Sequence, residues 1–394
     1  MNTEFDLLII GGGLVGGSLA LALKDSGLKI ALVEAVSEAE RVASPANERA
    51  LALSRGTVQI LERLRVWSAV QPHAMPIRHI HVSDRGHFGK TRLHAHDRAV
   101  DALGYVALAK HVEGAIQAQL ASASVTAFCP ARVVGLKAGH DAVFATLKQG
   151  DESLNLKARL CVAADGGNST VRTLLGIEQV VREYGQTAIV AEVQTEKDTA
   201  FTAYERFTRS GPLAMLPLGR HACSVVWSLH DADAQDMLQR GDGEWIEALQ
   251  DAFGQWLGRL SLASRPQGFP LRLVQAARMT DERVVLIGNA SHQIHPVAGQ
   301  GFNLGLRDAE VLAEHLLAQH RLGDDIGAED FLGHFAAARR RDLNRVVGFT
   351  DGLVRVFSSD FGPVMRVRNL ALMALDRIPA AKRLLTHYAM GYRG

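Results

Sequence analysis

The sequence predicts an α/β fold in which a parallel-sheet domain is interrupted by a mainly antiparallel sheet and followed by a C-terminal helical segment. Three observations predict it. Two short apolar runs enclose a helical stretch at the start of the chain, strand-like pieces of alternating polarity fill its middle, and a buried strand followed by a long helix returns near residue 283. Because parallel-sheet elements flank the antiparallel block, we expect the first domain to be discontinuous in sequence.

The chain opens with the pattern of a strand, a helix and a second strand. Residues 5–10 are an apolar run bounded by glycine, residues 14–24 have helical composition, and residues 29–34 are a second buried run. Residues 49–67 follow with apolar side chains at helical spacing and predict another helix.

A hairpin is predicted next, over residues 77–92, with a Gly-containing turn at residues 84–86. Its two faces alternate: His79, His81 and Ser83 lie on one, and Ile80 and Val82 on the other. Further along the chain, residues 110–120 predict a helix and residues 158–164 a buried strand.

The middle block, residues 187–273, predicts a separate antiparallel layer. It contains strand-like pieces at residues 188–193, 201–207 and 223–229 and a helix near residues 245–260, and it is followed by a buried strand at 283–288 and a helix at 301–319. We therefore expect a first domain of residues 1–75, 97–182 and 276–330, a second domain of residues 76–96 and 183–275, and a C-terminal helical segment of residues 331–394.

Composition and charge narrow the class of protein. Of 394 residues, 47% are apolar and 22% charged, and the formal net charge is +1, so the chain can fill hydrophobic cores and disorder is disfavoured. A strongly basic nucleic-acid binder is disfavoured too. The near-neutral total conceals one asymmetry, because residues 331–394 carry 11 Arg and Lys against four Asp, a net charge of +7.

Cysteine usage and the apolar opening of the chain favour a protein of the reducing cytoplasm. Cys129, Cys161 and Cys223 lie far apart, which fits neither a disulfide framework nor a CxxC pair. Residues 7–23 carry no charge, but they are few for a membrane span, have glycines at their centre and follow no basic n-region of a signal peptide. We expect no export.

A glycine-rich turn joins the first strand to the first helix. Gly11, Gly13 and Gly16 form GxGxxG, in which the glycines make the tight turn, admit a pyrophosphate to the backbone N–H groups and allow close helix–strand packing. Glu34, at the end of the next strand, can accept hydrogen bonds from a ribose diol and repels a 2′-phosphate. Strand, glycines, helix and acid in this register predict a Rossmann-like dinucleotide site.

Two further segments follow buried strands. Residues 163–172 (AADGGNSTVR) put Asp165 at the carboxyl end of a strand, where α/β sheets bind ligands, although an Asx turn capping a helix near Ser169 explains the same residues. Residues 288–308 (GNASHQIHPVAGQGFNLGLRD) lead through small-residue turns into a helix that begins Gly-Gln-Gly. Bare N–H groups at such a helix start suit a developing negative charge.

Together these three segments resemble the aromatic hydroxylases of the flavoprotein monooxygenase family, whose marks are GxGxxG, a DG motif and a GD motif. The likeness covers nearly the whole chain, and residues 49–67, 81–89 and 288–308 are most similar to the ubiquinone-biosynthesis branch. The resemblance implies bound FAD, NAD(P)H as a transient hydride donor, and a flavin C4a-hydroperoxide formed from O2 that the ring of a polyprenylated phenol attacks.

The resemblance also implies roles for particular residues, beginning with the cofactor. It places the ADP half of FAD on Gly11, Gly13, Gly16 and Glu34, with Arg49 reaching the pyrophosphate or flavin and Lys110 or His111 adding a contact. Asp165 would belong to the DG motif, which touches the pyrophosphate and helps to handle the nicotinamide donor. Backbone N–H groups of Gly299, Gln300, Gly301 and Asn303 would face the flavin pyrimidine.

One residue departs from the family pattern, and the catalytic residues have two interpretations. The GD motif normally has aspartate where this chain has Asn289, whose amide still accepts a hydrogen bond from a ribityl hydroxyl but lacks the charge. By the same resemblance Pro296 borders the space where oxygen reacts. His292 and His295 either accept the phenolic proton of the substrate or satisfy backbone groups beside the proline turn.

Six histidines between His73 and His96 include two HxH pairs, but no carboxylate or cysteine recurs nearby at ligand spacing, so we predict no metal site. The function we favour is O2-dependent hydroxylation of a polyprenylated phenol. A sibling hydroxylase acting at another ring carbon, a non-catalytic FAD-containing subunit of the biosynthetic complex and a plain NAD dehydrogenase are the alternatives.

The basic, apolar residues 331–394 have two interpretations as well. They are either a surface that meets the membrane or a partner in a ubiquinone-biosynthesis complex, or a helical appendage packed on the core. Arg339, Arg340 and Arg341 belong to this segment. The oligomeric state stays open.

Overall fold

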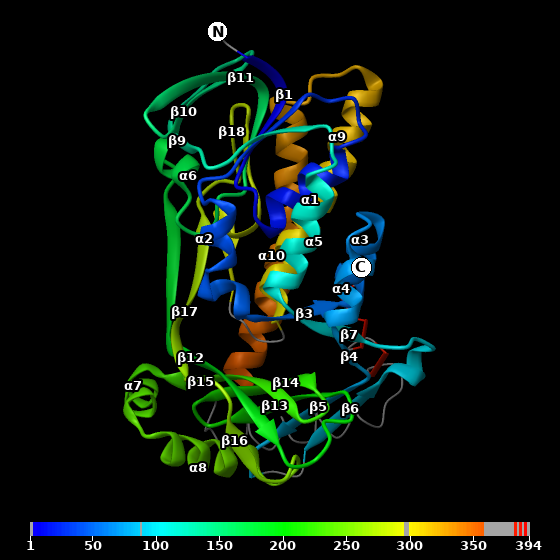
Figure 1. Cartoon of the computed structure of the whole chain (residues 1–394), viewed down its shortest axis with the longest axis vertical. Helices are drawn as coiled ribbons and strands as arrows, with labels where there is room; N and C mark the ends of the chain where they lie inside the picture. The colour runs from blue at the N-terminus through cyan, green and yellow to red at the C-terminus, as the bar shows by residue number, and fades with distance from the viewer. Residues whose placement is uncertain are drawn as a thin grey trace.

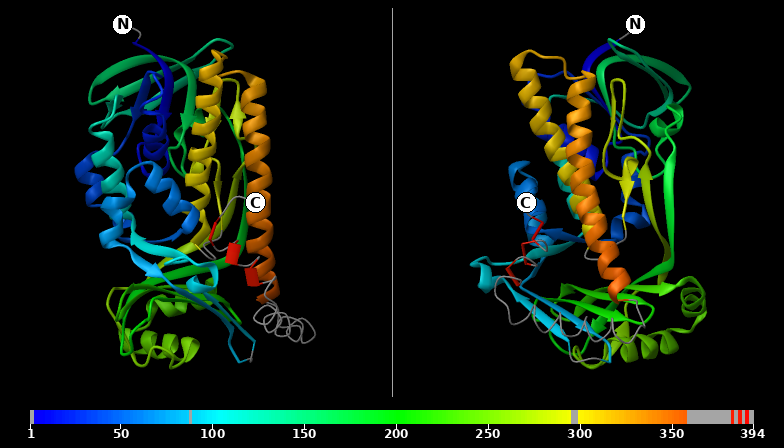
Figure 2. Two further views of the ribbon diagram at one scale, coloured as in Figure 1. Left: turned by 90° about the vertical axis from the view of Figure 1, so that its right-hand side faces the viewer. Right: turned by 180° about the vertical axis from the view of Figure 1, so that it is seen from behind.

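The computed structural model describes residues 3–86, 89–294, 299–357, 382–383, 386–387 and 390–391, and it confirms the predicted α/β fold (Figure 1). An eight-stranded and a nine-stranded sheet lie toward opposite ends of the long axis, and a three-stranded sheet lies between them (Figures 1 and 2). Part of the predicted C-terminal segment, including residues 358–381, lies outside the described residues.

The eight-stranded sheet contains the parallel part of the fold. Its strands run in the order β18-β19-β11-β1-β2-β8, and β10 and β9 extend it in antiparallel pairing from β11. Their bounds are β1 (Thr3–Ile10), β2 (Ile30–Val33), β8 (Val125–Phe128), β9 (Arg132–Ala138), β10 (Val143–Gln149), β11 (Glu152–Ala163), β18 (Thr280–Asp281) and β19 (Val284–Leu286). β1 pairs in parallel with both β2 and β11, which confirms the predicted strand–helix–strand opening.

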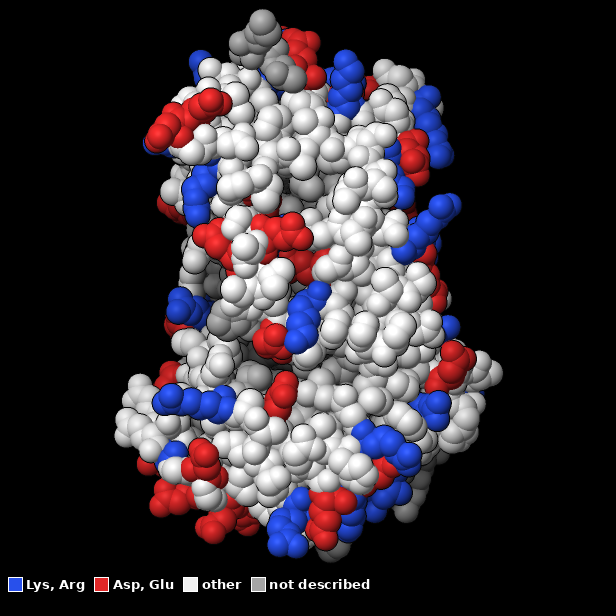
Figure 3. Space-filling model, in the orientation of Figure 1, with Lys and Arg blue, Asp and Glu red and all other residues white. Residues whose placement is uncertain are grey.

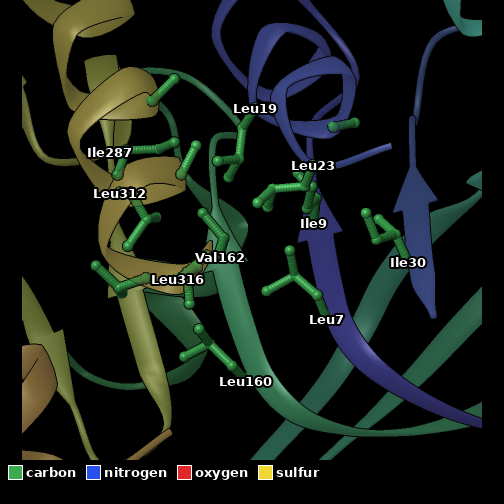
Figure 4. Close-up of a cluster of buried hydrophobic side chains, with 14 of the residues drawn as sticks. Leu7, Ile9, Leu19, Leu23, Ile30, Leu160, Val162, Ile287, Leu312 and Leu316 are labelled. Atoms are coloured by element: carbon green, nitrogen blue, oxygen red, sulfur yellow. The ribbon is translucent and has the colours of Figure 1, made fainter. Parts of the chain in front are cut away.

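Two helices cover one face of this sheet and form its core. Leu7 and Ile9 of β1 and Leu160 and Val162 of β11 pack against α1 (Leu14–Leu23) and α9 (Gln300–Leu322) (Figure 4). Their side chains are fully buried, which contributes about 1.5–3 kcal/mol each. Because this packing holds both helices on one face of the sheet, it also sets the positions of their N-termini.

The nine-stranded sheet is mainly antiparallel, as predicted for the middle block. Its order is β20-β17-β12-β15-β14-β13-β5-β6, with β16 on β12, and the β13–β5 pair alone is parallel. The strands are β5 (His79–Asp84), β6 (Lys90–His94), β12 (Gln179–Thr195), β13 (Thr202–Thr208), β14 (Gly211–Gly219), β15 (Ala222–His230), β16 (Leu260–Leu262), β17 (Gln267–Ala276) and β20 (His292–Gln293).

One face of this second sheet is covered by α7 (Asp231–Gln239) and α8 (Asp242–Phe253) (Figure 1). Trp245 and Phe253 of α8 are buried there against Met215 and Val225. The long strands β12 and β17 pair along most of their length and extend from this end of the molecule toward the other sheet (Figure 1).

Two predicted helices have different bounds. The helix predicted over residues 49–67 is wrong at its start, because β3 (Ala50–Ser54) pairs with β7 (Gly104–Leu108) before α3 (Arg55–Arg63) begins. Ser54 caps that helix by accepting a hydrogen bond from the N–H of Thr57. The helix predicted near residues 245–260 ends at Phe253, since Gly254 adopts a φ of +90° and residue 260 already begins β16.

The three-stranded sheet, in the order β3-β7-β4, includes β4 (Met75–Ile77). The remaining helices are α2 (Glu38–Val42), α4 (Trp67–Val70), α5 (Ala109–Leu120), α6 (Thr170–Leu174) and α10 (Glu329–Phe357). No helix of the described residues is long and apolar enough to cross a membrane. Lys and Arg alternate with Asp and Glu over the face seen in Figure 3. The predicted domain boundaries stay predictions.

Candidate active site

The glycine turn after β1 leaves open space in front of the first helix. A side chain at Gly11, which has a φ of +101°, or at Gly16 would overlap backbone atoms, so these two glycines are required for packing. A Cβ at Gly13 would meet nothing within 4 Å, and no side chain caps the N-terminus of α1 there. Uncapped N–H groups that face open space suit a pyrophosphate.

The carboxylate of Glu34 is held over this turn. One oxygen accepts a hydrogen bond from the N–H of Gly12 at 2.7 Å, and the other accepts one from the N–H of Val36 at 2.8 Å. The side chain is half-buried at the end of β2. It is thus fixed beside the helix start, where the ribose next to a bound pyrophosphate would lie.

The two carboxylate oxygens of Asp165 differ: one takes part in the turn before α6, and the other is available to a ligand. Its Oδ2 accepts a hydrogen bond from the N–H of Val171 at 3.1 Å, while Ser169 caps α6 by accepting from the N–H of Arg172. Its Oδ1 is buried and has no hydrogen-bond partner among the described residues. Since a buried carboxylate oxygen without a donor is costly, this atom fits a ligand hydroxyl or bound water.

The predicted basic contacts lie at the start of α5, where Lys110 and His111 are in its first turn and the carbonyl of Arg49 accepts a hydrogen bond from the N–H of Ala109. Arg49 is exposed, yet burial among neighbouring protein atoms lowers the pKa of its guanidinium, with Glu113 opposing that shift. Lys110 donates to both carboxylate oxygens of Glu48, at 2.7 and 2.9 Å, and His111 stacks on His73.

The start of α9 is built around the buried amide of Asn303. Its Nδ2 donates to the carbonyls of Ala52 and Gly299, and its Oδ1 accepts from the N–H of Ser54 and the hydroxyl of Thr57. The amide therefore uses its full hydrogen-bonding capacity within the protein. Its contribution to a flavin would be its backbone, as predicted, while its side chain holds the helix start against β3.

Near this turn, Gly301 and Asn289 are accessible to a ligand, whereas Gly299 is packed against the protein. Gly301 has no neighbour closer than 4.0 Å to an added Cβ, so the first turn of α9 faces free space. Gly299 has a φ of +61° and lies against Ala52, which makes the turn tight. Asn289 is exposed, and its amide has no hydrogen-bond partner among the described residues. These backbone and amide groups fit a flavin and its ribityl chain.

Behind the helix start lies a buried charge network that the sequence did not predict. Asp308, fully buried, accepts from the N–H of Gly288 at 2.9 Å and from Nε of Arg339 at 2.7 Å. Arg339 also contacts Asp342, which pairs with Arg307. Arg339 is 5% exposed, so it belongs to the core and not to a basic surface.

His292, one of the predicted proton acceptors, lies beside this network. Its ring is 3% exposed, and neither nitrogen has a hydrogen-bond partner among the described residues. Burial lowers the pKa of His292, with Asp308, 3.6 Å away, opposing the shift. The imidazole is therefore neutral near pH 7. The other predicted catalytic residues, His295 and Pro296, lie outside the described residues.

The histidines of the β5–β6 hairpin form a local pair instead of a metal-type cluster. Nδ1 of His79 and Nδ1 of His94 are 2.8 Å apart, as a hydrogen bond requires. Within the part of the chain that the structure describes, no three His, Cys, Asp or Glu residues are grouped as metal ligands would be.

The site and fold define an FAD-binding protein, and the chain belongs to the FAD binding domain family, whose model matches residues 4–349. It is an FAD-dependent monooxygenase of the group that includes the ubiquinone hydroxylases. Ubiquinone hydroxylase UbiL of Rhodospirillum rubrum is 37% identical over 388 residues, which cover 98% of this chain and 89% of that protein. The 3-demethoxyubiquinol 3-hydroxylase of Escherichia coli is 31% identical over 393 residues, 99% of each chain.

A solved structure shares the fold. The p-nitrophenol 4-monooxygenase PnpA of Pseudomonas putida superposes with a TM-score of 0.81 over the whole of both chains, at 19% identity. The predicted family and FAD cofactor are confirmed, whereas the assignment of individual site residues stays a prediction.

Gly13→Val should remove FAD while leaving the fold intact, because the new side chain projects into the open space before α1. We expect the Kd of the apoprotein for FAD to rise at least about tenfold, or ~1.4 kcal/mol. Flavin fluorescence titration measures it, and thermal melting of the apoprotein checks the fold. Gly114→Val, on the exposed side of α5 and equally without close neighbours, is the matched control. Unchanged FAD affinity in Gly13→Val would place the dinucleotide elsewhere.

Arg339→Ala should destabilise the protein by about 3–5 kcal/mol, because it leaves the buried carboxylate of Asp308 without its counter-charge. Urea unfolding of the FAD-loaded enzyme measures the loss. Arg340→Ala removes an exposed neighbour on the same helix and should change the unfolding free energy by less than about 0.5 kcal/mol. Equal stability of the two variants would contradict a compensating role for Arg339.

Proposed function

We propose that this monooxygenase hydroxylates the aromatic ring of a polyprenylated phenol in ubiquinone biosynthesis, converting 2-octaprenyl-6-methoxyphenol to the 1,4-benzoquinol. The observation that carries the proposal is the similarity, over 98% of the chain, to a ubiquinone hydroxylase. Asn289, at the place where the family's GD motif has aspartate, supports this member of the branch.

A sibling reaction at another ring carbon is the second candidate. It is favoured by the relative named as a 3-demethoxyubiquinol 3-hydroxylase, which aligns over the same length. A non-catalytic FAD-containing subunit is not retained, because the chain belongs to the FAD-dependent monooxygenases, and the experiment below separates the two ring positions.

The residues of the site would divide the work on the cofactor. When bound, FAD would accept a hydride from NAD(P)H and activate O2. The start of α1 and Glu34 would hold the ADP half, and the free oxygen of Asp165 would receive a hydroxyl or water beside the pyrophosphate. The N–H groups at the start of α9 would stabilise negative charge on the reduced ring.

A polar pocket of about 370 Å³ beside the DG motif fits the approach of the hydride donor. Gly167 and Asn168 line it next to Asp165, Gln293 borders it from β20, and Arg272 of β17 contributes a guanidinium. A cation at this position suits a phosphate of NAD(P)H.

Arg272→Ala should raise the KM for NAD(P)H about tenfold while the affinity for FAD stays unchanged, because none of the residues that line the pocket is among those predicted to hold FAD. Stopped-flow reduction of the bound flavin measures the donor's affinity directly. Arg265→Ala, an exposed arginine before the same strand, serves as the control. Equal donor affinity in both variants would move the donor site away from Arg272.

The substrate implies where the enzyme works. Since a polyprenyl tail partitions into the bilayer, we expect a cytoplasmic protein at the inner face of the membrane. Residues 331–394, with their net charge of +7, would contact anionic lipid or a partner in the ubiquinone-biosynthesis complex. The burial of Arg339 limits such contact to the other basic residues of the segment.

Purified FAD-loaded enzyme should oxidise NAD(P)H faster when 2-octaprenyl-6-methoxyphenol is present, and the product should carry one oxygen atom from ¹⁸O2. Mass spectrometry detects the label, and NMR of the product locates the new hydroxyl. A label at another ring carbon would establish the sibling reaction. Bound flavin with no labelled product from any prenylphenol would contradict both ring hydroxylations.

A further inference from the structure

The nine-stranded sheet has two faces, and α7 and α8 cover one of them. Side chains such as Met215 and Val225 are buried beneath α7 and α8. Alternate residues point the other way, toward the three-stranded sheet and the eight-stranded sheet beyond it (Figures 1 and 2). We call this side the inner face.

Glu205 of β13 belongs to the inner face. Its neighbours Tyr204 and Arg206 point to the covered side, since Tyr204 contacts Phe253 and Arg206 donates to the carbonyl of Ala252. Ala203 lies on the inner face, where it packs with the buried Ile77 and Val106 of the small sheet. Glu205 follows Ala203 on the same side, roughly 7 Å further along the strand.

The residues beside Glu205 on the inner face are apolar. Pairing across the sheet aligns it in one row with Val82 of β5, Ala214 of β14, Val226 of β15 and Val190 of β12. All five side chains are half-buried, whereas Met215, Val225 and Ala191 on the covered face are at most 2% exposed. A carboxyl group thus lies in the middle of a half-buried apolar band.

The inner face and the flavin side of the molecule meet through the small sheet. Ala50 of β3 packs in the same cluster as Ala203, and two residues later Ala52 receives the hydrogen bond from Asn303 at the start of α9. The band that contains Glu205 and the glycine turn of α9 therefore border the same region between the two large sheets.

The carboxyl of Glu205 has the properties of a proton acceptor for a weak acid. Desolvation by the surrounding protein raises its pKa from 4.5 to about 7, although the side chain keeps access to solvent, as in a recess. The pKa of a phenol is ~10, so the raised pKa of Glu205 reduces the pKa difference between the phenol and the carboxyl that accepts its proton. No hydrogen bond joins the carboxyl to another described residue.

Few charged groups face Glu205. Asp84 lies on the same face of β5, two residues after Val82. Glu192 lies on the same face of β12, two residues after Val190 and three strands away from Glu205. β14 has no ionisable residue, Tyr105 of β7 points away onto Trp67, and α10, which contacts β14, has Arg345 among the described side chains of its second half. The covered side holds His81 and Arg206.

We propose that Glu205 is the residue that binds the hydroxyl of the phenolic substrate and accepts its proton during hydroxylation, while the apolar band around it holds the ring. This inference rests on the proposed function. The O–H bond breaks, its proton passes to a carboxylate oxygen of Glu205, and the electron pair left on the phenol oxygen enriches the ring carbon that bonds to the incoming oxygen. O2 and NAD(P)H remain the co-reactants of the enzyme's own activity.

Glu205→Gln in the FAD-loaded enzyme should lower kcat for the prenylphenol about 10²-fold with a smaller change in KM. In the wild type kcat should rise with pH through about 7, because the carboxylate is the active form. The glutamine variant should lose that step, and Glu205→Asp should keep it in weakened form. Glu247→Gln, an exposed carboxylate of α8, is the matched control.

Two measurements do not depend on turnover. The native carboxyl keeps its proton to higher pH than the unfolded chain, so the unfolding free energy of the wild type should fall from pH 4.5 to about 7 more steeply than that of Glu205→Gln. Titration of the oxidised holoenzyme should show that the wild type binds a phenol about tenfold more tightly than its methyl ether, and that Glu205→Gln loses this preference.

The outcomes separate the two proposals. Glu205→Gln with the wild-type kcat, pH profile and phenol preference overturns the role of Glu205 in an otherwise active hydroxylase. A uniform loss of kcat at every pH, with the phenol preference kept, indicates a purely structural residue and also overturns it. If the wild type forms no hydroxylated product, the proposed function fails, and the phenol preference still decides whether Glu205 binds the hydroxyl.

Discussion

The four hydrogen bonds of the Asn303 amide fix the start of α9. Three of them tie its first turn to β3 and to the capped start of α3, across about 250 residues of sequence, and the fourth joins the amide to the carbonyl of Gly299. Because the amide is buried and fully satisfied, loss of any one bond would leave a polar group without a partner at real cost. The small sheet that contains β3 packs in turn against Ala203 on the inner face of the large antiparallel sheet, so it connects the start of α9 to that face.

A second constraint lies on the opposite side of α9. The buried carboxylate of Asp308 holds the N–H of Gly288, one residue before Asn289, and Arg339 of α10 neutralises it. Since the carboxylate of Asp308 is already paired with Arg339, it does not replace the negative charge that an aspartate at the position of Asn289 would carry. The long C-terminal helix is therefore part of the support of the cofactor site, which explains why an arginine from a basic segment is 5% exposed.

The sequence predicted those features whose signal is local. Glycines bounding apolar runs predicted β1, α1 and β2, and uncapped glycine turns predicted where α1 and α9 begin. It failed for β3, because residues 49–67 fit a helical period and the partner strand β7 lies some 50 residues away. The sequence left Arg339 between a basic surface and a packed helical appendage, because Asp308, its partner, is 31 residues distant. A lone glutamate in a strand gives no signal at all, since its face depends on pairing.

The electrostatics of the site follow from these placements. At the starts of α1 and α9, backbone N–H groups favour negative charge on a cofactor, and no buried cation is needed for this. On the inner face of the nine-stranded sheet, the carboxyl of Glu205 lies among alanine and valine side chains, which cannot solvate its charge. In the proposed role of Glu205, a phenol that carries an apolar tail would suit such a surface, because its ring and tail would replace water against the apolar residues while its hydroxyl met the carboxyl. A polar phenol would make the contact with the carboxyl but would gain little from the apolar residues. Selection of a lipid-like phenol would then follow from the same desolvation that makes the carboxyl basic.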